Sequence, residues 1–149
     1  MSLCTLGARA DSTPDPCSPT TACTATCTSS PCQVSLTRNG SSLSLTYNGT
    51  DASILCAADY STVKWAAQTA LPSLIGAFFS ASHYPGSTNI VTGSSTVAAS
   101  TNVSAPNQAQ SCYVYSVMVC DSTGSCAKVD PRVIVTGVHP KAKKKKKEY

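Results

Sequence analysis

Cysteine is the residue type with the most chemical potential in this chain, because nine of the 149 residues are cysteines. That density is high for a protein kept reduced in a cytosol, and it is typical of exported domains braced by disulfides. We expect disulfides among eight candidates, which are Cys17, Cys23, Cys27, Cys32, Cys56, Cys112, Cys120 and Cys126. The odd count implies that at least one thiol is free, joins another chain or is lost in processing.

One pairing follows from the local pattern around residues 112–126. The residues up to Cys120 alternate in polarity, and Asp121 to Gly124 supply a turn, with Gly124 available for a positive backbone angle. Facing residues of such a hairpin lie close enough for a disulfide, so we predict a Cys120–Cys126 bridge. The alternative is that one of the two pairs with Cys112 or with the N-terminal region.

The other pairings stay open. Cys32 and Cys56 lie near the ends of expected strands and could close a longer loop, whereas Cys4, Cys17, Cys23, Cys27 and Cys112 allow too many combinations to order. A four-thiolate zinc site at Cys17, Cys23, Cys27 and Cys32 is the alternative to disulfides. Structural zinc sites usually present paired Cys-x-x-Cys motifs, and none occurs here, so we expect no metal.

Catalytic patterns are scarce. The chain has no Gly-x-Ser-x-Gly, phosphate-binding loop, His-Glu-x-x-His or redox Cys-x-x-Cys motif. The carboxylates of Asp51, Asp59, Asp121 and Asp130 are the remaining candidates for acid–base work, and Asp121 and Asp130 suit turns better. A calcium site at Asp121 or Asp130 is an alternative. We predict no enzyme activity, no catalytic residues and no cofactor.

A lysine-rich tail carries the positive charge of the chain. Six lysines, Lys141, Lys143, Lys144, Lys145, Lys146 and Lys147, account for more than half of the 11 basic residues. Without residues 140–149 the chain is close to neutral. Such a run stays disordered and attracts anionic surfaces or polymers. It has no aromatic residue before Tyr149 for base stacking, so we expect no sequence-specific nucleic-acid binding; the alternative is a solvated end.

Aromatic residues suggest both a core and a contact surface. Trp65, Tyr113 and Tyr115 are expected in the core, with Tyr113 or Tyr115 making the hydrogen bond of a sandwich corner. Adjacent Phe78 and Phe79 cannot both face inward on a strand, so one of them could join Tyr84 in a contact patch. Packing against the N-terminal region is the alternative for this patch of Phe78, Phe79 and Tyr84.

The elements that position these residues are predicted to be short strands. Alternating runs and turn signals recur at roughly ten-residue spacing between residues 33 and 137. Helix formers are sparse, and Ser and Thr replace most charged residues, which make up 12% of the chain. We expect an all-β antiparallel sandwich of seven or eight strands over residues 33–138. Residues 1–32 form an irregular arm held by disulfides, and residues 139–149 the tail.

The final hairpin carries a family resemblance. Tyr113-x-Tyr115-Ser-Val117-x-Val119-x-Asp121-Ser-Thr-Gly124, ending in residues 133–137, resembles the last two strands of bacterial immunoglobulin-like and polycystic-kidney-disease-type domains. Trp65 sits where that family places its buried Trp, and residues 42–47 sit at the second strand. The resemblance covers residues 33–137 and implies an immunoglobulin-like sandwich with adhesion, display or spacer roles. The cysteine load, the N-terminal arm and the lack of Trp-x-Phe-Gly-Asp-Gly depart from it.

These features predict a secreted or cell-surface module for binding, adhesion or structural display, tethered by its tail to an anionic surface. The alternative is a subunit of an extracellular filament or virion surface that self-associates through the N-terminal arm. No apolar run is long enough to span a membrane, and Met1 to Cys4 do not resemble a signal peptide, so a leader is expected to be missing from this chain. Asn39, Asn48 and Asn102 match the glycosylation pattern, which matters only in a secreting eukaryote.

Overall fold

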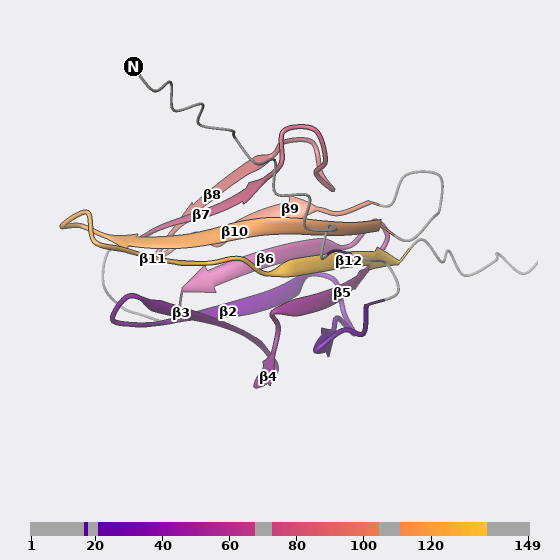
Figure 1. Cartoon of the computed structure of the whole chain (residues 1–149), viewed down its shortest axis with the longest axis horizontal. Coiled ribbons are helices and arrows are strands. Elements are labelled where there is room, and N and C mark those ends of the chain that lie inside the picture. The colour runs from indigo at the N-terminus through magenta and orange to yellow at the C-terminus, as the bar shows by residue number, and fades with distance from the viewer. Residues whose placement is uncertain (1–16, 18–20, 68–72, 105–110, 137–149) are drawn as a thin grey trace, which may run out of the picture.

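Alternating apolar residues build the strands of this protein. The computed structural model describes residue 17 and residues 21–67, 73–104 and 111–136. These residues contain twelve strands and no helix, so the chain is all-β, as predicted. The strands form two sheets, whose arrangement is seen in Figure 1.

The larger sheet has seven strands in the order β1, β5, β12, β10, β7, β8, with β11 also paired to β10. Their bounds are β1 Ala25–Thr26, β5 Ile54–Ala58, β7 Ser73–Phe79, β8 Ile90–Ser94, β10 Ser111–Asp121, β11 Cys126–Val129 and β12 Arg132–Thr136. β1 belongs to the arm that was expected to be irregular, and it pairs with β5. Part of the arm is therefore a strand of the sheet.

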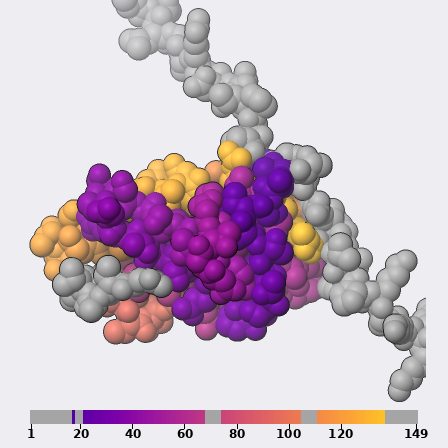
Figure 2. All heavy atoms as spheres, turned by 90° about the horizontal axis from the view of Figure 1, so that it is seen from below, coloured from indigo at the N-terminus to yellow at the C-terminus, as the bar shows by residue number. Residues whose placement is uncertain are grey.

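The smaller sheet has five strands in the order β4, β3, β2, β6, β9. Their bounds are β2 Cys32–Asn39, β3 Ser42–Tyr47, β4 Thr50–Asp51, β6 Thr62–Ala67 and β9 Ala99–Asn102. Figure 2 views the molecule from below, where the early strands, in purple, dominate the surface. β2 and β3 form the hairpin expected from Asn39-Gly40, with Gly40 at a φ of 62°.

The expectation of purely antiparallel sheets is wrong, because both sheets are mixed. β5 runs parallel to β1 and to β12, and β2 runs parallel to β6. Parallel neighbours need a long crossover connection. The chain supplies one between β2 and β6 by passing through β3, β4 and then β5 of the other sheet. Polar and apolar residues alternate in the same way in parallel and antiparallel strands, so the sequence pattern could not reveal which strands pair in parallel.

More strands form than the predicted seven or eight, partly because one expected strand is divided. β11 pairs with the second half of β10 and β12 with the first half, and Asp130 and Pro131 separate them. Pro131 has no N–H to donate to the ladder. Its carbonyl still accepts a hydrogen bond from the Tyr115 N–H at 3.2 Å. The final hairpin is therefore one long strand facing two short ones.

The core lies between the two sheets and centres on three aromatic rings. Trp65 of β6 is fully buried, and its ring centroid lies 5.4 Å from that of Tyr115 of β10. Phe79 of β7 stacks on Tyr115 at 4.8 Å. The Trp65 Nε1–H donates to the Tyr115 hydroxyl at 3.1 Å, so both buried polar groups have a partner. Trp65 and Tyr115 are core residues, as expected.

Candidate functional site

The eight candidate cysteines form four disulfides in the structure. The pairs are Cys17–Cys112, Cys23–Cys56, Cys27–Cys32 and Cys120–Cys126. Cys120 and Cys126 are partners in the β10–β11 ladder, with Cα atoms 4.0 Å apart, which is the pairing expected from the hairpin. Cys4 lies outside the described residues.

The suggested link between Cys32 and Cys56 is not formed. Cys32 begins β2 in the smaller sheet and is fully buried in the core between the sheets. Cys56 belongs to β5 of the larger sheet, where Leu55 and Ala57 point into the core. Alternation therefore puts the Cys56 side chain on the outer face of the larger sheet, whereas the Cys32 side chain lies between the sheets.

Two disulfides attach the N-terminal segment to the outer face of the larger sheet. Cys112, Ile134 and Cys56 are neighbours across β10, β12 and β5, and Cys17 and Cys23 bond to the two outer members of this row. Ile134 points away from the core, since its neighbours in β12 belong to the core cluster, yet it is only 1% exposed. Cys17 and Cys23 thus lie over the outer face, bonded to the neighbours of Ile134.

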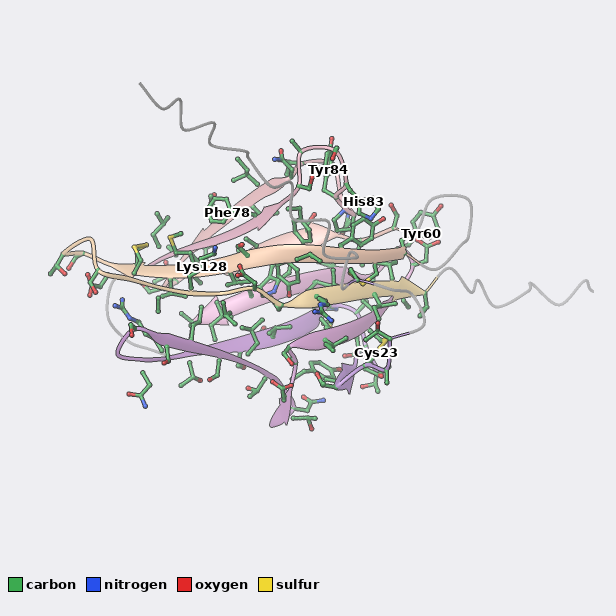
Figure 3. All side chains as sticks on the ribbon, viewed as in Figure 1. Cys23, Tyr60, Phe78, His83, Tyr84 and Lys128 are labelled. Carbon is green, nitrogen blue, oxygen red and sulfur yellow. A yellow bond between two sulfur atoms is a disulfide. The ribbon has the colours of Figure 1, made fainter. Side chains whose placement is uncertain are left out.

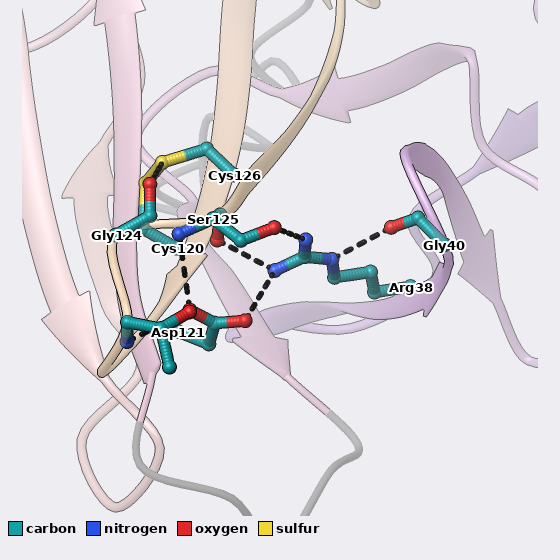
Figure 4. Close-up of a disulfide and its surroundings, with 8 residues drawn as sticks. Arg38, Gly40, Cys120, Asp121, Gly124, Ser125 and Cys126 are labelled. Atoms are coloured by element: carbon teal, nitrogen blue, oxygen red, sulfur yellow. Dashed lines mark hydrogen bonds and ion pairs between the residues drawn. A yellow bond between two sulfur atoms is a disulfide. The ribbon is translucent and has the colours of Figure 1, made fainter.

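Polar contacts also join the two sheets, between the end of β2 and the turn that connects β10 with β11 (Figure 4). Arg38 of β2 donates to the Ser125 carbonyl at 2.8 Å and to the Ser125 hydroxyl at 2.6 Å, and it lies 3.6 Å from the Asp121 carboxylate. The same carboxylate accepts hydrogen bonds from the Thr123 hydroxyl and from the Thr123 and Ser125 N–H groups. These bonds, the Thr123 hydroxyl above all, lower the pKa of Asp121.

The other carboxylate considered for metal binding is also used locally. Asp130 accepts a hydrogen bond from the Ser116 hydroxyl at 2.6 Å and lies 3.4 Å from the Lys128 ammonium group. The Ser116 bond is the main cause of the lowered pKa of Asp130. Among the described residues, no three His, Cys, Asp or Glu side chains are grouped so that they could hold a metal ion.

Of the expected contact patch of Phe78, Phe79 and Tyr84, one phenylalanine and the tyrosine are exposed, as the adjacent pair required. Phe79 is 5% exposed and belongs to the core, because successive side chains of β7 point to opposite faces of the sheet. Phe78 is exposed on the outer face, where its ring lies over Gly76 of the same strand. Tyr84 lies in the loop after β7 and lines a cavity. Only Phe78 and Tyr84 remain available at the surface.

A groove formed by loops and by the ends of β6 and β9 is the candidate binding site of the described chain. Its lining consists of Tyr60, Thr62, residues 85–88 and residues 100–104, and its volume is about 570 Å³. A second cavity of about 390 Å³ is lined by residues 81–86, Ser104 and Tyr113, and shares Pro85, Gly86 and Ser104 with it. We call the first the loop-end groove and the second the adjoining cavity. Figure 3 labels Tyr60, His83 and Tyr84 around this region.

Close backbone packing shapes the loop-end groove. A Cβ atom on Gly86 would collide with the Thr101 hydroxyl and lie 2.8 Å from the Asn102 carbonyl, so only glycine fits this close approach. The Pro85 carbonyl accepts hydrogen bonds from the Ser104 N–H at 3.0 Å and from the Ser104 hydroxyl at 3.1 Å. These contacts hold the 85–88 loop against β9.

Tyr60 stands at the rim of the loop-end groove in an unusual backbone conformation. Its φ is 62°, in the left-handed region that a bulky non-glycine residue seldom adopts. The Tyr60 N–H donates to the Val103 carbonyl at 2.9 Å, and the Ser61 N–H donates to the Ala58 carbonyl. The side chain is 72% exposed. Strained residues of this kind concentrate at functional sites, which makes Tyr60 a candidate binding residue.

His83 lines the adjoining cavity and contacts the start of β10. Its Nε2–H donates to the Cys112 carbonyl at 3.0 Å, and its ring stacks on Tyr113 at 4.3 Å. The Tyr113 hydroxyl donates to the Ser104 carbonyl at 3.1 Å, the corner hydrogen bond expected at the start of this strand. Burial is the main cause of the raised pKa of Tyr113. The imidazole is thus a structural group of this cavity.

The chemistry of the loop-end groove suits binding. Its described lining offers hydroxyl, amide and backbone groups around one aromatic ring, with no Asp, Glu, Lys, Arg or His. A nucleophile and a general base within hydrogen-bonding distance are what catalysis of group transfer would need, and this lining supplies no such pair. The arrangement can hold a ligand by stacking and by hydrogen bonds.

Sequence reasoning missed the groove, although part of its signal was available. Residues 83–87 were expected to be a loop, and Pro85-Gly86 is a turn signal. Nothing in the sequence indicates that this loop meets β9 and Tyr60, which lie far away along the chain. Tyr60 takes its left-handed conformation as the third residue of the Ala58 to Ser61 turn, a position where glycine or asparagine would have been the sequence signal.

Comparison with known proteins gives this chain no relatives: no family model, no curated protein and no solved structure matches it.

The predicted anionic-surface residues, Lys141 and Lys143 to Lys147, lie outside the described residues. Within the described part of the chain, no helix is suited to crossing a membrane.

Proposed function

We propose that this protein is an extracellular immunoglobulin-like module that binds a ligand at the loop-end groove. The observation that carries the proposal is the set of four disulfides, which uses all eight cysteines of the described residues. Disulfides persist in oxidising compartments and are rare in reducing ones. A module stabilised by disulfides, with few charges and no nucleophile and general base together in the described groove lining, suits adhesion, binding or display.

The resemblance to immunoglobulin-like domains draws support from three features. The two sheets enclose one core, Trp65 is buried within it, and the Tyr113 hydroxyl bonds back to the Ser104 carbonyl. A tyrosine at the start of the penultimate strand makes such a bond in immunoglobulin domains. The parallel pairs between β2 and β6 and between β1 and β5 depart from a purely antiparallel sandwich.

Thiol alkylation of native protein, without reduction, tests the extracellular assignment. Intact mass should show eight protected thiols per chain, with the ninth either alkylated or linked to another chain. Nine alkylated thiols in protein taken from its source would refute an oxidised, exported module.

The lysine tail is proposed as a tether to anionic surfaces. Deleting residues 141–147 should abolish retention on heparin resin at low salt and leave the melting temperature unchanged, because exposed charges act through screened electrostatics. Equal retention after the deletion would refute the tether.

Assembly into a filament or particle surface is the second candidate function. The observation that favours it is a set of exposed apolar side chains on the larger sheet, which are Leu74, Phe78, Ile90 and Val114. Phe78 and Ile90 are direct neighbours across β7 and β8, and β8 lies at one edge of the larger sheet. Sedimentation velocity at increasing concentration should show ordered oligomers that Ile90→Lys prevents. A monomer at every concentration would exclude this function.

A further inference from the structure

The geometry of the loop-end groove points to a ligand class: we propose that it binds a neutral oligosaccharide. This inference rests on the proposed binding function and specifies its ligand. The groove and the adjoining cavity have volumes of about 570 and 390 Å³, within the range of small-molecule sites. They share Pro85, Gly86 and Ser104, so the two hollows are adjacent and a ligand of several linked units that fills the groove would extend toward the adjoining cavity.

Tyr60 provides the aromatic surface that such a ligand needs. The faces of sugar rings carry C–H groups, which pack on the electron-rich face of an aromatic ring. The left-handed backbone of Tyr60 and its N–H bond to the Val103 carbonyl fix the position from which the side chain projects. The backbone at this position therefore needs no ordering when a ligand binds, which lowers the entropic cost of binding.

The polar groups of the lining are suited to hydroxyl ligands. The Thr62 hydroxyl donates to the Asn102 Oδ1 at 2.7 Å, which fixes the amide so that its N–H groups are presented as donors. The Thr62 oxygen can still accept a hydrogen bond, and the exposed Ser87 and Ser100 hydroxyls can both donate and accept. Sugar hydroxyls also donate and accept, so they match a lining of mixed donors and acceptors.

The groove lining favours a neutral ligand, although Lys64 lies opposite Ser100 at its edge and His83 lines the adjoining cavity. The described lining has no cationic group for a phosphate or carboxylate, and no anionic group for an amine. Burying an unpaired charge there would be costly. An apolar ligand would instead cover hydroxyl and amide groups without replacing their water, at about 1–3 kcal/mol for each group left unsatisfied. A neutral ligand rich in hydroxyls avoids both costs.

Titration of the ¹⁵N-labelled full chain with hexasaccharides tests this inference. The neutral probes are maltohexaose, cellohexaose, xylohexaose and chitohexaose, and the anionic probe is a heparin hexasaccharide. We expect at least one neutral probe to shift the amide signals of Tyr60, Gly86 and Asn102. The absence of such shifts for all four neutral probes at about 10 mM, beyond the range of weak specific binding, would overturn the proposal.

Matched variants separate stacking from a general loss of structure. Tyr60→Asn removes the ring, and asparagine tolerates the left-handed conformation, so the fold should survive. Its affinity should fall at least about tenfold, as expected for truncating an aromatic anchor. Tyr60→Phe keeps the ring and should bind more tightly than Tyr60→Asn, because stacking needs the ring face. Phe78→Ala, an exposed aromatic change outside the groove lining, should bind as the wild type does.

Two further results would overturn the proposal. One is unchanged affinity in Tyr60→Asn. The other is a heparin hexasaccharide that shifts the groove signals of a chain lacking residues 141–147 more strongly than any neutral probe. Thiol alkylation tests the extracellular assignment independently of sugar binding. An extracellular module that fails to bind sugar is therefore distinguishable from a protein that is not extracellular.

Discussion

Removing the Cys17–Cys112 disulfide should destabilise the protein more than removing any of the other three. This bridge joins residues 95 positions apart, whereas the others span 33, 6 and 5 positions. A disulfide acts largely by restricting the unfolded chain, and the restriction grows with the length of the loop that it closes. The matched comparison is the Cys120–Cys126 bridge, which spans 6 positions.

The loop-closure relation gives the expected size of the effect. It assigns about 4.7 kcal/mol to a separation of 95 residues and about 2.2 kcal/mol to a separation of 6. The difference of about 2.5 kcal/mol corresponds to a change of about 70-fold in the folding equilibrium. Packing adds to it in the same direction, because Cys112 is 7% exposed and lies beside buried Ile134, whereas Cys126 is exposed.

Urea unfolding of the C17A/C112A and C120A/C126A variants, followed by circular dichroism without reductant, measures this difference. The C17A/C112A variant should also have the larger denaturant dependence, because its unfolded chain expands and exposes more surface. Equal losses of unfolding free energy, or a larger loss in C120A/C126A, would refute the reasoning from loop length.

Three other changes test individual contacts. Tyr115→Phe leaves the buried Trp65 indole N–H without its acceptor and should cost about 1–3 kcal/mol of unfolding free energy, measured in urea, whereas Tyr84→Phe at the surface should cost under about 0.5 kcal/mol. The lowered pKa of Asp121 means that its carboxylate stabilises the fold above its ordinary pKa near 4 and loses that contribution as the pH falls. The melting temperature of the wild type should therefore fall more steeply than that of Asp121→Asn between about pH 5 and pH 2, and parallel curves would contradict this role. Gly86→Ala should destabilise the protein by about 1–3 kcal/mol and shift the Thr101 amide signal, since the added methyl group has no space; a neutral substitution would show that the loop moves freely away from β9.

The features that the sequence predicted correctly are local ones. The Asp121 to Gly124 turn, the alternation of β10 and the facing positions of Cys120 and Cys126 all depend on residues close together in the chain. Burial of Trp65 follows from its size and its place in an alternating run. Local polarity contains enough information for these features, because each depends on strand period and turn chemistry alone.

The features that it could not predict depend on which strands become neighbours. Cys23 pairs with Cys56 because β1 lies beside β5, and the parallel direction of that pair leaves no trace in either strand's alternation. The loop-end groove likewise requires the 85–88 loop to meet β9. Such proximity is decided by sheet order, for which this single sequence offers no pairing signal.

The Cys17–Cys112 disulfide and the loop-end groove are connected by contacts at the start of β10. The Cys17–Cys112 disulfide fixes Cys112, whose carbonyl accepts the His83 Nε2–H. The next residue, Tyr113, stacks on the His83 ring and donates to the Ser104 carbonyl, while Ser104 donates to the Pro85 carbonyl at the groove. A covalent link thus anchors a chain of contacts that ends in the lining of the site. Under the proposed binding function, loops held in this way lose less freedom when the ligand binds, so removing the Cys17–Cys112 disulfide should weaken binding as well as lower stability.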